Sequence, residues 1–267
     1  MNRFIKSLFC LCLCGFLLSG CSFDISGINS AVDAVAPIKL TGELETKTFL
    51  PSNGFAGRKL EFENISVSSK DNKAKIYIIP SDETKVEVTY PSDILDYGFR
   101  VYYQEGEIEI SVPKQTNFIA EAFQVFVYAN IEEIDISGGV ALEMNAADSR
   151  KIDIDVKGAA AIYIYNIAAE SVEAEIAGAA DVNLSGTADY FDMELKGAGA
   201  IDAKNLICKK TEVRISGAGS ASVSVTDELM ADVDGVGALE YYGDPIIKNI
   251  SGGLTDVEQV SKEVYGG

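Results

Sequence analysis

Carboxylates recur at two fixed positions of a repeating unit between residues 132 and 260. The unit is marked by seven glycines spaced 17 to 20 residues apart, and the slots three and five residues before these glycines hold ten acids in fourteen places. The glycines are Gly138, Gly158, Gly178, Gly197, Gly217, Gly235 and Gly252. The acids are Glu133, Asp135, Asp153, Asp155, Glu173, Glu175, Asp192, Glu194, Glu212 and Asp232. Carboxylates in such rows could collect divalent cations, face a basic partner surface, or supply the acid and base of a glycosidase or lyase.

A candidate acidic binding face follows from seven of these residues. They are Asp135, Asp153, Asp155, Glu173, Glu175, Asp192 and Glu194. Neighbours about 5 Å apart in water would repel by roughly 0.8 kcal/mol per pair before salt screening. Lys157, Lys196 and Arg214 would offset part of this repulsion. The alternative is a solvated sheet face whose charge keeps copies of the chain apart. No acid has a neighbour that distinguishes it, so we assign no catalytic residue, no metal site and no cofactor.

Tyr163 and Tyr165 form a candidate aromatic contact. They alternate with Ile162 and Ile164, so we expect both rings to point outward. Exposed ring pairs can stack on sugars or contact a protein partner. The alternative is packing between ordinary tyrosines of neighbouring strands.

The elements that would position these side chains are strands. Apolar residues stand two and four positions before each glycine and four and six after it, with polar residues between, which is strand periodicity on both sides of a turn. A period near 20 suits one coil of a β-solenoid, whose coils must stack to bury their apolar faces. We expect the bend at Gly197-Ala198-Gly199 to use a positive φ. In the last copy, Ile250 fills an apolar slot, whereas Lys248, Asp256 and Glu258 replace apolar residues.

The prediction is an all-β, single-domain solenoid over residues 47–260, with about 18–20 residues per coil. Residues 47–131 would form three or four irregular coils, 132–255 the regular glycine-cornered coils, and 256–267 a capping helix or strand. Lys39 to Phe62 would form the N-terminal cap. The segment Ala120 to Tyr128 is apolar at almost every position, so we expect a strand buried on both sides.

The N-terminus predicts export and lipid attachment. Residues 1–20 combine Arg3 and Lys6 with an apolar run and end in Leu-Ser-Gly before Cys21, which resembles a bacterial lipobox. Cys21 would carry the lipid, and three acyl chains suffice for stable anchoring. Residues 21–46 would be a flexible tether. We therefore expect a cell-envelope lipoprotein of the outer membrane; an ordinary secretory signal with an incidental cysteine is the alternative.

The amino-acid composition argues against several classes of function. The chain of 267 residues has 41 Asp and Glu against 22 Lys and Arg, a net charge of −19, and no His. Nucleic-acid binding needs a basic surface and is disfavoured. Lack of histidine removes the commonest general base and zinc ligand. After removal of the signal and lipidation, only Cys208 remains, and no intramolecular disulfide can form.

The repeats resemble the bacterial family of auto-transporter-like adhesin head domains (the head GIN domain), a domain of unknown function common in Bacteroidetes. The residues that carry the resemblance are 176–186, 195–199 and 215–219. Tyr242-Gly243-Asp244-Pro245 and the alternation around Ile76, Val86 and Ile108 fit as well. The resemblance covers about residues 55–258 and implies a right-handed, single-stranded parallel β-helix. It carries over no catalytic residues.

Together these observations predict a lipid-anchored, non-enzymatic adhesin-like or binding module for a glycan or protein. Its partners would be the membrane, through the N-terminal lipid, and that glycan or protein ligand; a divalent cation is a further ligand that the acids could bind. One alternative is a polysaccharide-processing β-helix enzyme that uses stacked carboxylates. Another is an envelope scaffold or sensor partner.

Overall fold

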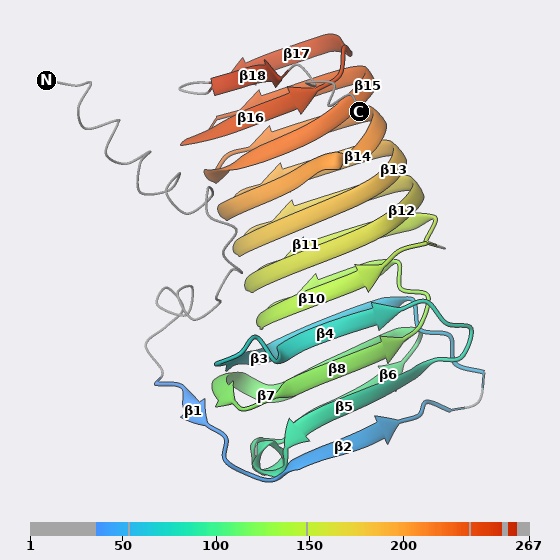
Figure 1. The fold of residues 1–267 in the computed structure, drawn as a ribbon, viewed down its shortest axis with the longest axis vertical. Coiled ribbons are helices and arrows are strands. Elements are labelled where there is room, and N and C mark those ends of the chain that lie inside the picture. Colours follow the sequence, from blue (N-terminus) through green and yellow to red (C-terminus); the bar gives the residue numbers. More distant parts are fainter. Residues whose placement is uncertain (1–35, 53, 148, 235, 253–255, 261–267) are drawn as a thin grey trace, which may run out of the picture.

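The computed structural model describes residues 36–52, 54–147, 149–234, 236–252 and 256–260. The described chain is almost entirely β, and its strands stack into a parallel β-solenoid (Figure 1). The exception is a short 3-10 helix, η2 (Ser92–Tyr97). The described residues contain no helix with the length and hydrophobicity of a transmembrane span.

The regular coils comprise β9 to β18, and each stacks on the one before it, running upward from β10 in Figure 1. The long strands of this half turn a corner without losing their strand character, so one strand contributes to two faces. The strands are β9 (Glu133–Ile136), β10 (Gly139–Asn145), β11 (Lys151–Val156), β12 (Ala159–Ile176), β13 (Ala179–Leu195), β14 (Ala198–Ile215), β15 (Ala218–Val233), β16 (Val236–Tyr242), β17 (Ile246–Gly252) and β18 (Asp256–Val260).

Inward-facing side chains form continuous apolar columns along the stack. Ile154 pairs with Ala174 and Ala174 with Met193, and each of these side chains is at most 2% exposed. Ile176 and Ile215 are also buried, as the alternation predicts. Because each coil covers the apolar face of the next, the core depends on neighbouring rungs being in register.

The corner glycines are needed for close approach of the backbone. A Cβ added at Gly158, Gly178 or Gly197 would clash with the carbonyl oxygen of the glycine one coil earlier. The expected positive φ is absent at Gly197, although Gly199 has φ 156°. Position 197 therefore requires glycine because there is no room for a Cβ, and not because the backbone needs a positive φ there.

The N-terminal coils do not stack in chain order. Strand β3 (Lys59–Ser69) lies between β7 (Glu107–Ala120) and β9, pairing with both. Likewise β4 (Ala74–Ile79) lies between β8 (Phe123–Tyr128) and β10. The coil formed by β3 and β4 is thus inserted between a later coil and the first regular one, as Figure 1 shows for β8, β4 and β10.

The N-terminal end of the stack is closed by antiparallel strands. β2 (Leu44–Phe49) pairs with β5 (Lys85–Pro91), β5 pairs with β8, and β6 (Arg100–Gln104) pairs with β7. The expected cap over Lys39 to Phe62 is therefore wrong at its C-terminal end, where the first residues of β3 lie within the stack. β1 (Ile38–Lys39) pairs with β7, so residues 38–39 and, in β2, 44–46 of the expected tether are strand.

Strand β8 is buried on one face only, which corrects the expectation for Ala120 to Tyr128. Phe123, Val125 and Val127 are buried, whereas Gln124, Phe126 and Tyr128 are half-buried on the outer face. An apolar residue can occupy the outward position of Phe126 because its ring stacks on that of Tyr77. The ring centroids are 4.9 Å apart, and the angle between the ring planes is 12°.

The last rung departs from the predicted register. Gly252, rather than Ile250, lies opposite Val233, and Ile250 lies opposite Ala231 and is 42% exposed at the end of the stack. Val257, rather than Asp256, lies opposite Leu239, and Glu258 lies opposite Glu240 instead of Tyr241, so Glu258 occupies an outward position and not the predicted inward slot. Within the β15–β17 pair the register also shifts between Leu229 and Met230. The predicted cap over 256–267 is a strand, β18, as far as it is described.

Candidate functional site

The structure brings the predicted acids together in two outward columns. Asp153 lies opposite Glu133 on one side and Glu173 on the other, and Glu173 lies opposite Asp192. In the second column Asp155 lies opposite Asp135 and Glu175, and Glu175 lies opposite Glu194. All seven residues of the candidate acidic face therefore lie on one sheet face. At the upper end, Ser251 rather than Asn249 lies opposite Asp232 and donates a hydrogen bond of 2.8 Å to it.

Both columns continue below the regular coils, where sequence reasoning missed them. Lys59 lies opposite Glu133 and Glu107, and Glu61 lies opposite Asp135 and Glu109. The signal was the alternation Lys59-Leu60-Glu61-Phe62, which matches residues 133–136 but is followed by Asn64 instead of the corner glycine. We call the two columns together, from β7 to β17, the acidic face.

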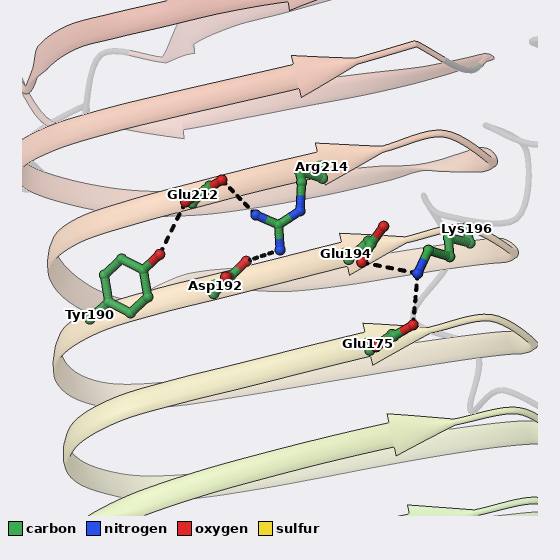
Figure 2. A network of polar contacts seen from close by, with 7 residues as sticks. All are labelled: Glu175, Tyr190, Asp192, Glu194, Lys196, Glu212 and Arg214. Carbon is green, nitrogen blue, oxygen red and sulfur yellow. Dashed lines mark hydrogen bonds and ion pairs between the residues drawn. The ribbon is translucent and has the colours of Figure 1, made fainter.

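Basic side chains bridge rungs of the acidic face. Lys196 pairs with Glu175 of the rung below at 2.8 Å and with Glu194 at 3.1 Å (Figure 2). Arg214 pairs with Asp192 of the rung below at 2.7 Å and with Glu212 at 2.6 Å (Figure 2). Lys59 spans Glu133 and Asp135 at 2.9 and 2.5 Å. Each cation therefore offsets the repulsion between two carboxylates.

Two further lysines pair within their own strand. Lys151 contacts Asp153 at 2.6 Å, and Lys157 contacts Asp155 at 2.5 Å. Of the seven predicted acids, six thus have a basic partner, and Glu173 is the one without a salt bridge among the described residues. The face is a set of paired charges rather than a bare row of carboxylates, so it attracts cations less than its acid content suggests.

Two carboxyl groups of the face hold protons more tightly than usual. A hydrogen bond with Glu107, burial and the charge of Glu107 raise the pKa of Glu61 to about 7. Burial and the neighbouring Asp153 raise the pKa of Glu173. By contrast, the hydrogen bond from Lys196 lowers the pKa of Glu175. The pKa of a carboxyl here depends on whether a cation or another acid is its neighbour.

No metal-binding group of three or more Cys, Asp or Glu side chains occurs in the part of the chain that the structure describes. A shallow surface hollow of about 390 Å³ lies near η2, lined by Asp96, Tyr97, Gly98, Pro113, Lys114 and Thr116. It includes no residue of the acidic face. The carboxylates therefore line a sheet surface and not this hollow.

The two predicted tyrosines lie on a different face of the solenoid. Tyr163 and Tyr165 on β12 are 46% and 39% exposed, as the alternation predicts. Tyr163 lies between Glu143 of β10 and Asn183 of β13. Tyr165 lies beside Asn145. Each ring therefore has polar side chains, rather than another ring, on neighbouring rungs.

More aromatic residues share this second face below the tyrosines. Tyr77 lies opposite Glu143 and Phe126, and Tyr128 lies opposite Ile79. The sequence alone could not place them, because the coils that carry them stack out of chain order. The only signal was alternation within β4 and β8.

The cysteines contribute no described reactive site. Cys208 is 1% exposed, and burial raises the pKa of its thiol to about 12, so it stays protonated and unreactive. Cys21, the predicted lipid attachment site, lies outside the described residues.

Fold and surface together define a class of protein: a parallel β-solenoid with one charge-paired face and one partly aromatic face. Solved structures support this architecture. One is the crystal structure of a putative adhesin from Bacteroides fragilis. The alignment covers 84% of this chain and all of the adhesin chain, with 21% sequence identity and a TM-score of 0.71. One from Parabacteroides distasonis has the same coverage and identity and a TM-score of 0.59. A structure from P. distasonis described as a putative lipid binding protein has 17% identity, covers 84% of this chain and all of its own, and has a TM-score of 0.57.

The family model described as "Putative auto-transporter adhesin, head GIN domain" matches residues 61–245. The chain belongs to this family, as the repeats predicted. A comparison with curated proteins finds no match.

Proposed function

We propose that the chain is an adhesin-like binding module that displays its sheet faces on the cell envelope and performs no catalysis. The observation that carries this proposal is the rigid stack of in-register rungs, which repeats side chains at fixed spacing on extended outer faces. Such surfaces suit extended ligands. Membership of an adhesin family and the solved adhesin-like folds agree with it.

Lipid attachment at Cys21 would hold the module at the membrane. The motif Leu18-Ser19-Gly20-Cys21 after a short basic and apolar run supports this part of the proposal. Ser22 after Cys21 argues against an inner-membrane retention signal of the enterobacterial kind, which supports an outer-membrane location. The ligand would be a glycan or a protein that contacts an outer face.

One observation favours a second candidate, a polysaccharide-processing enzyme. Glu61 has a pKa of about 7 and hydrogen bonds with Glu107, and a carboxylic acid that is half protonated near neutral pH can act as a general acid. Against this candidate, Glu61 lies on an outer sheet surface, and the hollow near η2 does not include it. A glycosidase needs its two carboxyl groups on either side of a bound sugar.

The test uses cells that produce the full-length chain and the purified full-length protein. We expect the chain to fractionate with membranes, the protein to bind members of a glycan and protein panel, and no glycan to be cleaved. The variant Cys21→Ser should leave the membrane fraction while the purified variant keeps its binding. Glycan cleavage that Glu61→Gln abolishes would refute the non-enzymatic function, and unchanged fractionation of Cys21→Ser would refute the anchor.

A further inference from the structure

Six large side chains gather on the outer face formed by β8, β4, β10 and β12. We call them the aromatic stripe: Tyr77, Ile79, Phe126, Tyr128, Tyr163 and Tyr165. Figure 1 shows that β8, β4 and β10 lie side by side, and β12 pairs with β10. Ile79, Tyr163 and Tyr165 are between 36% and 46% exposed. The stripe therefore spans four rungs along the stacking axis and is only two outward positions wide. On the β10 rung, between β4 and β12, these positions hold Glu143 and Asn145 instead of large apolar or aromatic side chains.

The charges beside the stripe are balanced, unlike those of the chain as a whole. Lys75 pairs with Glu143 at 2.6 Å, and Lys85 pairs with Glu87 at 2.7 Å. The same lysines lie over rings of the stripe, with Lys75 Nζ 5.3 Å from the Tyr77 centroid and Lys85 Nζ 4.3 Å from that of Tyr128. A charged ligand would find no unpaired opposite charge at these four residues. A neutral ligand avoids desolvating an unpaired charge.

Several side chains at and beside the exposed rings have hydrogen-bond donors or acceptors that are not used within the described part of the protein. Among the described residues, the hydroxyls of Tyr163 and Tyr165 and the amide of Asn183 have no protein partner, whereas Tyr190 and Tyr103 donate to Glu212 and to the carbonyl of Phe49. Asn145 accepts a hydrogen bond of 3.2 Å from Asn166 and keeps its own amide donors. Aromatic faces with amides and hydroxyls one rung away suit a pyranose, which has an apolar face and equatorial hydroxyls.

The area of the aromatic stripe favours a glycan over a protein as its ligand. Four rungs spaced about 4.8 Å apart and two outward positions about 7 Å apart give a patch of less than about 200 Å². A stable protein interface needs about 800 Å² per partner. The sheet above the stripe carries Asp181, Asp202 and Glu240 at outward positions, so a larger contact would spread onto acidic surface. The stripe fits a few sugar units in a row.

We propose that the aromatic stripe binds a neutral, linear glycan that lies along the stacking axis, with Tyr163 and Tyr165 as the stacking residues. This inference rests on the proposed binding function and names its ligand class. Asn145 and Asn183 hydrogen bond to the sugar hydroxyls. The Tyr77–Phe126 stack supports the lower end of the stripe.

The test measures binding of the purified full-length chain to neutral linear hexasaccharides, with cellohexaose and mannohexaose as probes and hexagalacturonate as the charged counterpart. Calorimetry gives the affinity. Tyrosine fluorescence gives a second readout, because the chain has no tryptophan. We expect a neutral probe to bind, the charged probe to bind at least tenfold more weakly, and Tyr163→Ala and Tyr165→Ala each to weaken binding at least fivefold.

Matched variants separate contact from folding. Tyr163→Phe keeps the ring and should retain most of the affinity. Tyr102→Ala removes a tyrosine that is 50% exposed on β6, outside the stripe, and should bind like the parent. Failure of every neutral probe, or binding that ignores both tyrosine variants, would overturn the inference. If the chain then bound a protein or charged glycan elsewhere, the proposed function would survive, whereas a chain that bound nothing would refute both.

Discussion

Each carboxylate of the acidic face is tuned by its nearest neighbours on adjacent rungs. Parallel strands in register place like residues side by side, so an acid at the same slot of every coil meets another acid unless a cation intervenes. Lys196 and Arg214 supply that cation for four carboxylates. At Glu61, where Glu107 is the hydrogen-bonding partner, the carboxyl group keeps its proton to higher pH instead.

The variant Glu61→Gln tests this at the residue scale. The pKa of Glu61 is about 7 when folded against 4.5 as its ordinary value, so between these values the folded state holds more protons and its stability falls as pH rises. Gln cannot ionise. Glu61→Gln should therefore raise the free energy of unfolding at pH 8, by about 1 kcal/mol or less at this solvated site, and leave it unchanged at pH 4.

Denaturant unfolding at both pH values measures this difference. Glu175→Gln is the control of opposite sign, because Lys196 lowers the pKa of Glu175 and the pair stabilises the fold above the ordinary pKa of the acid. Glu175→Gln should lower the free energy of unfolding at pH 8. Equal pH dependence of Glu61→Gln and the parent would show that Glu61 titrates normally.

At the scale of one coil, the corner between two strands is the feature that the sequence predicts best. Gly138, Gly158 and Gly178 recur because each approaches the carbonyl oxygen of the coil below too closely for a Cβ. The same close approach occurs at Gly197 and Gly217, so it marks the successive coils from Gly138 to Gly217, which is why the acid columns there were predictable. Gly252 resembles another corner but lies opposite Val233, so the pattern failed in the last rung.

The variant Gly217→Ala should destabilise the solenoid. Its Cβ would clash with the carbonyl oxygens of Gly197 and Lys196, so two rungs must move apart. We expect a loss of about 1–3 kcal/mol, as for overpacking, seen as a lower melting temperature by circular dichroism. Ser216→Ala, at the exposed neighbouring position, should change stability by less than about 0.5 kcal/mol. Equal melting of the two variants would mean that the corner has room.

Over the whole molecule, the order in which coils stack differs from their order in the chain. Strand alternation predicted the strands of residues 47–131, but it says nothing about which coil lies on which. That order is decided by contacts between residues far apart in sequence, such as Glu61 with Asp135 and Tyr77 with Glu143. The lower part of both the acidic face and the aromatic stripe therefore came only from the structure.

The lower parts of the acidic face and of the aromatic stripe both depend on the order in which the coils stack. Paired cysteines test this order directly. Glu61 lies next to Asp135 on adjacent strands, whose spacing of about 4.8 Å suits a disulfide, whereas Glu109 and Asp135 are two rungs, about 9.6 Å, apart. The native Cys208 is buried and should not compete. After mild oxidation, peptide mapping by mass spectrometry should find the disulfide in Glu61→Cys/Asp135→Cys and none in Glu109→Cys/Asp135→Cys. The reverse result would show that the coils stack in chain order and would contradict the account.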